Sequence, residues 1–337
     1  MEYSDFYEEF GSPFSGRKKQ KLVDFLAKEG LTYDEQIENS VNLVDGTGEI
    51  AASCSLHANV LKCIAVSDKY QGYGLSPRVV TLMSNIALEK DITHLFLFTK
   101  PKNKQMFSDL AFYPIMETDT VLLMENTRDG IVKYIDSLEK GEKSENIGAI
   151  VMNCNPFTNG HRYLIQTAAS ECDTLHLFVL SEDKSEFSAQ VRYDLVQKGV
   201  RDIPNVIVHK TSDYLISSAV FPTYFIKEKS KAEDANCELD LKIFCEYFAK
   251  KLNITKRFVG TEPNCQVTNA YNEKMKQILP QYGIEVIEVQ RIEAQGRAIS
   301  ASTVREYLHK GDIEKTKDLV PQSTYEYLQR EGYLYKK

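Results

Sequence analysis

Residues 147–289 alternate short apolar segments with longer amphipathic ones, and this pattern constrains the fold more than any other feature of the chain. The strand-like segments are residues 147–152, 175–180, 206–208, 257–260 and 284–289, and the helical segments between them are residues 161–171, 188–200, 238–252 and 268–279. Short apolar strands joined by helical crossovers predict an α/β fold with a Rossmann-like, doubly wound parallel sheet. Ligands of such sheets bind beyond the carboxyl ends of the strands.

The first third of the chain has a different pattern, which predicts a mixed α+β domain. Strands are expected at residues 40–44, 49–56, 60–66, 93–99 and 121–124, and an amphipathic helix begins near Pro77. The first three strands are joined by short turns and therefore predict an antiparallel arrangement. A polar stretch at residues 140–146 separates the two patterns, so we expect one domain at 1–140 and a second at 146–337.

Composition excludes several classes of protein. A formal net charge of −7 disfavours a nucleic-acid surface, which needs clustered Lys and Arg. The chain has no apolar run near the roughly 20 residues that span a bilayer, and its acidic N-terminus is not typical of a signal peptide. Its seven cysteines lack C-x-x-C spacing. We therefore expect a cytoplasmic protein that has no structural zinc and binds neither nucleic acid nor membrane.

The loop after the first strand of the second domain is the first candidate site. It contains Asn155, Phe157, Thr158, Gly160 and His161, and a helix begins at its end. A helix N-terminus offers free N–H groups and partial positive charge to a phosphate, and a glycine permits close approach. Thr158 and His161 add side-chain donors, and His161 is the first candidate for catalysis. The alternative is that these residues only cap the helix.

A second polar segment follows the last strand. Ser300, Ser302 and Arg305 stand at the start of another expected helix, where Ser302 is expected as the N-cap and Arg305 can reach the same phosphates. The alternative is a capped helix with a solvated arginine.

Four further features carry weaker expectations. Glu262 follows a strand and is expected either to accept a ribose hydroxyl or to cap the next loop. Lys184 and Arg192 follow the second strand, where a basic residue can meet phosphate, although surface exposure is the commoner outcome for either; Lys184 is kept as a candidate phosphate ligand. The small residues within 217–222 are a candidate acetate pocket.

The two motifs together resemble those of a known superfamily. Thr158-x-Gly160-His161 is similar to the T/H-x-G-H signature of nucleotidylyltransferases, and Ile299-Ser300-x-Ser302-x-x-Arg305 is similar to their I-S-x-S-x-x-R signature. Residues 153–164 and 258–263 narrow the resemblance to the citrate (pro-3S)-lyase ligase family. It implies ATP binding by the ten residues Asn155, Phe157, Thr158, Gly160, His161, Lys184, Glu262, Ser300, Ser302 and Arg305, with His161, Thr158 and Arg305 catalytic.

What this family implies is activation of citrate lyase. Acetate attacks the α-phosphate of ATP, whose phosphates carry Mg²⁺, and the resulting acetyl-AMP acetylates a thiol. That thiol belongs to a dephospho-coenzyme A derived group on the acyl carrier subunit of citrate lyase, the implied partner. No protein-bound metal is expected.

The first domain carries a resemblance of its own. Lys69, Gly72 and Gly74 lie between a strand and a helix, like the pyrophosphate loop of GNAT acetyltransferases, which binds coenzyme A. Phe107 stands where many GNAT enzymes have a tyrosine as general acid. The domain is therefore expected to hold the coenzyme-like arm of the carrier at Lys69, Gly72 and Gly74 rather than to catalyse ordinary acetyl transfer.

Two other functions remain open from the sequence. The ATP chemistry is compatible with a phosphomonoester acceptor such as nicotinamide mononucleotide or phosphopantetheine. A non-catalytic module that senses a coenzyme A derivative is the third alternative.

Overall fold

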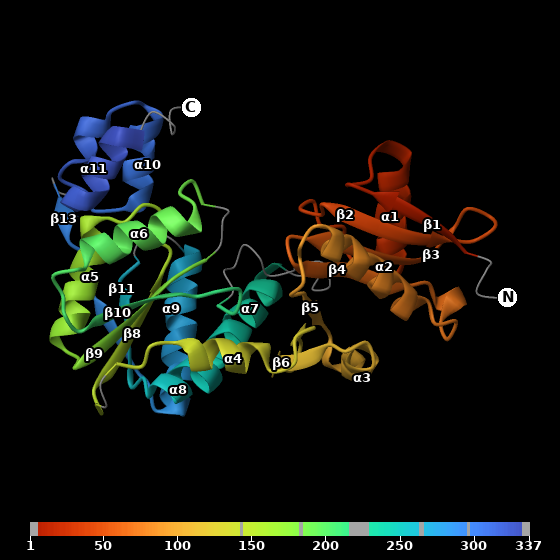
Figure 1. Cartoon of the computed structure of the whole chain (residues 1–337), viewed down its shortest axis with the longest axis horizontal. Coiled ribbons are helices and arrows are strands. Elements are labelled where there is room, and N and C mark those ends of the chain that lie inside the picture. The colour runs from red at the N-terminus through yellow and green to blue at the C-terminus, as the bar shows by residue number, and fades with distance from the viewer. Residues whose placement is uncertain are drawn as a thin grey trace. The chain divides into compact units, whose positions relative to one another are not determined.

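The computed structural model describes residues 6–141, 144–181, 185–215, 229–262, 266–294 and 297–331. The chain divides into two compact units, one formed by Met1–Ile131 with Ser218–Leu239 and the other by Val132–Ser217 with Asp240–Lys337. Helix α4 (Gly130–Ser137) begins at the end of the first unit, and α7 (Lys229–Ile243) contributes residues to both. Figure 1 labels many of the helices and strands of each unit.

The first unit is built on a seven-stranded sheet of order β1-β2-β3-β4-β5-β7-β6. Its strands are β1 (Tyr7–Gly11), β2 (Asn39–Val44), β3 (Ile50–His57), β4 (Val60–Val66), β5 (Phe96–Thr99), β6 (Tyr113–Glu117) and β7 (Leu122–Glu125). Strands β2, β3 and β4 pair antiparallel, as predicted, whereas β4 and β5 run parallel. The result is the predicted GNAT-like mixed α+β architecture.

The helical elements of the first unit include α1 (Gly16–Lys28), the 3₁₀ turns η2 (Asp68–Tyr70) and η3 (Pro101–Asn103), α2 (Leu75–Glu89) and α3 (Lys104–Ser108). Among them, α2 packs an apolar stripe into the core of the unit. On α2, the residues Val79, Val80, Met83 and Ala87 recur at helical spacing and are buried in the core with strand residues of the sheet. Elements β1 and α1 were not predicted, because their sequences are mostly polar and charged.

The second unit has a five-stranded sheet of order β10-β9-β8-β11-β12, in which all neighbours are parallel. Its strands are β8 (Ile147–Met152), β9 (Thr174–Val179), β10 (Val206–Lys210), β11 (Lys256–Gly260) and β12 (Glu285–Val289), followed by the small pair β13 (Glu293–Ala294) and β14 (Arg297–Ala298). This confirms the Rossmann-like, doubly wound sheet. The strand order reverses direction between β8 and β11, and ligands of this fold bind at such a switch point.

Helices lie on both faces of this sheet (Figure 1). They are α5 (Asn159–Ser170), α6 (Ala189–Gly199), the π-helix η4 (Phe244–Ala249), α8 (Lys250–Leu252), α9 (Gln266–Ile278), η5 (Leu279–Tyr282), α10 (Ala301–His309), η6 (Ile313–Thr316) and α11 (Gln322–Glu331). Leu177 and Val179 of β9 pack with buried residues of α5 and α6. Phe178, between them, points to the other face and lies edge-on against Phe248 of η4. This alternation is what a sheet covered on both faces requires.

Two buried histidines occupy neighbouring strands of this sheet. His176 of β9 and His209 of β10 share a hydrogen bond of 2.9 Å between Nδ1 and Nε2. Burial lowers the pKa of His176 to about 4, and burial together with the neighbouring His176 lowers that of His209 to about 3. Both rings are therefore neutral at pH 7.

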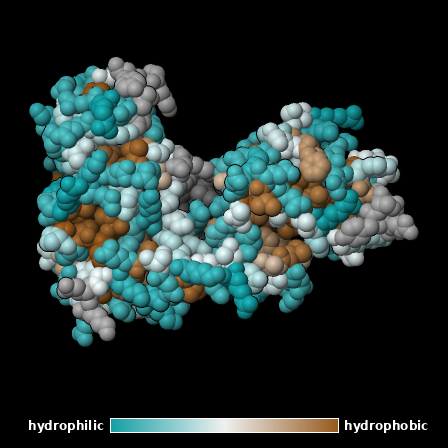
Figure 2. Space-filling view, in the orientation of Figure 1, coloured by the Kyte–Doolittle hydropathy of each residue, from teal (hydrophilic) through white to brown (hydrophobic). Residues whose placement is uncertain are grey.

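The face of the molecule shown in Figure 2 is mostly hydrophilic, with smaller hydrophobic patches on both units. Among the helices that the structure describes, none combines the length and apolar character needed to cross a membrane.

Candidate active site

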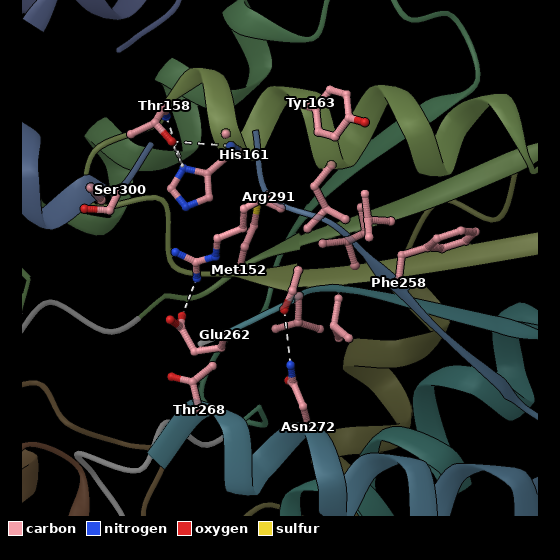
Figure 3. A pocket seen from close by; sticks show the side chains of 18 of the residues that line it. Met152, Thr158, His161, Tyr163, Phe258, Glu262, Thr268, Asn272, Arg291 and Ser300 are labelled. Atoms are coloured by element: carbon pink, nitrogen blue, oxygen red, sulfur yellow. Dashed lines mark hydrogen bonds and ion pairs between the residues drawn. The ribbon is translucent and has the colours of Figure 1, made fainter. Parts of the chain in front are cut away.

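A pocket of about 380 Å³ lies at the carboxyl ends of β8 and β11, where the strand order reverses. Residues of β8, α5, β11, α9 and the start of α10 line it. Figure 3 shows the side chains of this pocket, with His161 and Arg291 directed toward the same space. The pocket therefore occupies the edge of the sheet at which the fold predicts ligand binding.

Thr158 ends the loop after β8 and caps α5. Its backbone is extended, and its hydroxyl accepts a hydrogen bond from the His161 N–H at 3.3 Å. The His161 side chain accepts in return from the Thr158 N–H, with Nδ1 at 3.1 Å. This reciprocal capping box satisfies two helix N–H groups and fixes the imidazole ring against the first turn of α5.

The capping box also determines the protonation state of His161. Because Nδ1 accepts a hydrogen bond from the Thr158 N–H, the neutral ring is the tautomer that carries its proton on Nε2. In Figure 3 this second nitrogen points away from Thr158 into the pocket. Burial, followed by the positive charge of Arg291, lowers the pKa of His161 to about 4. At pH 7 the ring therefore presents an uncharged N–H donor.

The second motif forms the N-terminus of α10, but its N-cap is Ser300 and not Ser302 as expected. Ser300 has an extended backbone, and its hydroxyl accepts the Thr303 N–H at 3.1 Å. Ser302 lies within the first turn, and its hydroxyl accepts a hydrogen bond from Arg305 Nη2 at 3.1 Å. Ser300 takes the cap because β14 ends at Ala298 and the chain enters the helix shortly afterwards.

Gly160 brings the two motifs together. A Cβ atom at this position would lie 3.1 Å from the Ile299 carbonyl oxygen, so a larger residue would push the two helix starts apart. Thr158, Gly160, His161, Ser300 and Ser302 consequently line the same pocket. The N-termini of α5 and α10 therefore both contribute to one anion-binding environment.

Three other predicted residues, Asn155, Phe157 and Arg305, do not line this pocket but contact the loop and helices that form it. Phe157 is fully buried, stacks on the His161 ring at 6.1 Å and packs against Gly199. The Asn155 side chain accepts the Phe187 N–H at 3.1 Å. Arg305 donates through Nη1 to the Asn155 carbonyl and through Nη2 to Ser302. These contacts hold the loop after β8 in place.

Arg192 is buried, contrary to the expectation that it lies at the surface. Its Nη1 donates to the carbonyl oxygens of Asn153 and Leu180 at 2.8 and 2.7 Å, and its Nε donates to that of Phe187 at 3.0 Å. It thus binds three loop carbonyls at the carboxyl edge of the sheet. Lys184 and residues 217–222 lie outside the described residues.

Sequence reasoning missed two arginines of the pocket. Arg291 lies two residues after the end of β12 and forms an ion pair with Glu262, which also lines the pocket. Arg257 of β11 is almost fully buried, with its guanidinium 4.3 Å from the centre of the Phe244 ring. The position of Arg291 at the carboxyl end of a strand was an available signal, whereas the burial of Arg257 depends on tertiary packing.

The first unit contains the other predicted site. Gly72 and Gly74 have positive φ values of 84° and 70°, and Gly74 is the N-cap of α2. The ammonium of Lys69 lies 3.6 Å from the Asp45 carboxylate and 4.7 Å from the centre of the Tyr70 ring. The glycines therefore adopt the backbone conformation that a tight strand-to-helix turn requires.

A separate cleft of about 200 Å³ lies between the ends of β4 and β5. These strands pair only near their starts, at Val60–Phe96 and Leu61–Leu97, and then diverge. Ile64, Phe98 and Phe107 are among the described residues that line the cleft, whereas Lys69, Gly72 and Gly74 are not.

The model of the citrate lyase ligase C-terminal domain matches residues 147–328. Solved structures similar to parts of the chain include Escherichia coli ElaA (11% identity, TM-score 0.33, 36% of this chain and 99% of that chain). Another is a bifunctional NMN adenylyltransferase/ADP ribose pyrophosphatase from Francisella tularensis (18% identity, TM-score 0.36, 55% of this chain and 48% of that chain).

Curated relatives match almost the full length. The chain is 43% identical to the citrate (pro-3S)-lyase ligase of Escherichia coli over 320 residues, which cover 93% of this chain and 91% of the relative. It is 41% identical to the protein of the same name from Klebsiella pneumoniae, over 92% of each chain. The chain therefore belongs to the citrate lyase ligase family.

Proposed function

We propose that this chain activates citrate lyase by acetylating the thiol of its acyl carrier subunit at the expense of ATP. In the first step an acetate oxygen attacks the α-phosphorus, the bond to the β-phosphate oxygen breaks, and acetyl-AMP and pyrophosphate form. In the second step the carrier thiol loses its proton and attacks the acetyl carbonyl, and AMP leaves as the acetyl thioester forms.

The observation that carries this proposal is the neutral His161 donor facing one pocket with two helix N-termini, in a chain of this family. A pentavalent α-phosphate develops negative charge on its oxygens, and preorganised donors stabilise that charge without reorganising. An uncharged N–H held by a capping box is such a donor. Binding both substrates in one pocket also supplies proximity, so no covalent nucleophile from the protein is required.

The proposed roles follow from these positions. His161 Nε2 donates to the α-phosphate, and the first turns of α5 and α10 bind the β- and γ-phosphates through backbone N–H groups, with Ser300 and Ser302 beside them. Mg²⁺ enters on the ATP phosphates as part of the substrate. Thr158 orients His161, while Asn155, Phe157 and Arg305 hold the loop; ATP contact by Lys184 stays a prediction.

We further propose that the first unit docks the coenzyme-like arm of the carrier. Its support is the pair of positive-φ glycines at the start of α2 together with the cleft between the diverging strands β4 and β5. Backbone N–H groups of such a turn suit a pyrophosphate, and a narrow cleft suits a pantetheine chain. Phe107 in this cleft offers no acid–base group, which favours docking over catalysis.

The decisive experiment supplies the purified protein with ATP, magnesium, acetate and deacetylated citrate lyase. We expect one acetyl thioester on the carrier and one AMP for each turnover. Acetate-dependent exchange of labelled pyrophosphate into ATP, without carrier, isolates the first step. If the exchange rate does not depend on acetate but rises with nicotinamide mononucleotide or phosphopantetheine, the reaction is phosphomonoester adenylylation and the proposal is wrong. If no acceptor causes release of pyrophosphate, a sensing module is favoured.

A further inference from the structure

Arg291 has a different environment from Arg305, the arginine that the sequence motif designates for phosphate binding. The guanidinium of Arg305 is engaged at both ends, by the Asn155 carbonyl through Nη1 and by the Ser302 hydroxyl through Nη2. The first contact is with the loop after β8 and the second lies within α10, and Arg305 is not among the described residues that line the pocket. Arg305 is therefore occupied in fastening the loop after β8 to this helix.

Arg291 instead lines the pocket. Its Nε donates to the Thr261 carbonyl at 2.7 Å, which fixes the direction of the side chain, and Nη2 pairs with the Glu262 carboxylate. With the residues that the structure describes, Nη1 makes no hydrogen bond. Figure 3 shows the guanidinium between His161 and Glu262. A guanidinium with one anchored nitrogen, Nε, and two nitrogens directed into a pocket has the arrangement of an anion-binding arginine.

A nucleotide bound in this pocket would meet the negative charge of Glu262. Its side chain is 10% exposed, against 31% for Arg291, and it places a negative charge beside the donors of the site. A triphosphate would repel this carboxylate and offer the guanidinium a stronger partner of similar geometry. Because the phosphate would replace the carboxylate, Arg291 has an anionic partner both with and without bound nucleotide. Its positive charge is therefore never unpaired in the pocket.

We infer that Arg291 is the guanidinium that binds the ATP phosphates, and that Glu262 is its exchange partner, occupying Arg291 only until nucleotide arrives. This inference rests on the proposed function in that it takes ATP as the ligand. It assigns phosphate binding to an arginine in the segment after β12 and leaves Arg305 as a positioning residue. It also gives Glu262 a competitive role toward ATP in place of a direct contact.

The test measures ATP affinity by calorimetry, with ATP and magnesium and without acetate. Arg291→Met alone would leave the Glu262 carboxylate unpaired, so the informative variant is the double substitution Arg291→Met/Glu262→Gln. We expect its Kd for ATP to rise roughly 10- to 100-fold, the range for losing hydrogen bonds to a charged group. Glu262→Gln alone is expected to lower the Kd about two- to tenfold because it removes the competitor.

The matched control is Lys276→Met. Lys276 has similar exposure, 37%, and its ion pair with Glu288 joins α9 to β12 outside the pocket. Its Kd for ATP should stay within twofold of wild type, and thermal melting without nucleotide reports any loss of folding. A double variant that folds and keeps the wild-type Kd would overturn the inference, as would weaker ATP binding by Glu262→Gln. If wild type itself binds no ATP, the proposed function fails instead.

Discussion

Replacing His161 by glutamine separates its chemical role from its structural one. A capping box has Ser or Thr at the N-cap and Glu or Gln three residues later, so a glutamine in this position preserves the reciprocal hydrogen bonds with Thr158 that hold the start of α5. The change removes the imidazole Nε2–H from the pocket. Folding and catalysis should therefore respond very differently.

The expected magnitudes follow from these contacts. With the cap retained, the free energy of unfolding should change by less than about 0.5 kcal/mol, and Tm by less than about 2 °C. Loss of one preorganised donor to a developing oxyanion costs on the order of 10²–10³ in rate, or about 2.7–4 kcal/mol. Acetate-dependent pyrophosphate exchange at saturating ATP measures this rate. A His161→Gln protein that keeps its Tm and exchanges within tenfold of wild type would refute the assignment.

The pH dependence of exchange tests the charge state of His161. Since its pKa is lowered to about 4, the ring is neutral at pH 7, and its titration should leave the rate unchanged between pH 6 and 8. As pH falls toward 4, protonation of Nδ1 sets an N–H against the Thr158 N–H and the rate should drop. A cationic catalyst of ordinary pKa would instead lose about tenfold per pH unit above 6.5. Such a loss, absent from His161→Gln, would contradict the neutral-donor mechanism.

Two further predictions concern the glycine turn and the buried histidines. Alanine at both Gly72 and Gly74 should raise the KM for the carrier and spare pyrophosphate exchange, because both sites have positive φ; Gly46→Ala is the control, with open space and no positive φ. Unchanged carrier kinetics in the double variant would exclude the docking role. The lowered pKa values of His176 and His209 mean that the unfolded chain binds more protons, so stability is complete above about pH 6.5 and is lost as pH falls. Urea unfolding at pH 7 and 5 should show a loss that is roughly 2–4 kcal/mol smaller in a His176→Leu/His209→Leu variant, and equal losses would contradict this.

The features predicted correctly from the sequence are those set by local pattern. Apolar runs separated by helical spacing indicated the parallel sheet, and the sheet in turn indicated the edge at which to look for a ligand. Thr158 and His161 lie in the expected pocket because they end the loop after β8 and begin the helix that follows it. The position of a residue just after a strand can be read from the sequence itself, so it can be predicted without knowledge of tertiary contacts.

The errors concern residues whose environment is assembled from distant segments. Arg192 is buried because three carbonyls from two loops converge on its guanidinium, and no local sequence pattern indicates that convergence. Ser300 and Ser302 are equally good caps by sequence, and the end of the preceding strand selects Ser300. The pairing of Arg291 with Glu262 joins the ends of two strands that are adjacent only in the folded sheet.

These distant contacts bear on catalysis because they act on one loop. Arg192 binds the Asn153 carbonyl, Arg305 binds the Asn155 carbonyl, and Phe157 packs between Gly199 and His161. The segment that ends in the capping box is thus fixed from three directions before any substrate is present. A donor fixed in this way loses little conformational freedom when nucleotide binds, so its hydrogen bond is available for the transition state. By this reasoning, loss of the Arg305 contact should slow the reaction by loosening His161, whereas loss of Arg291 should weaken ATP binding directly.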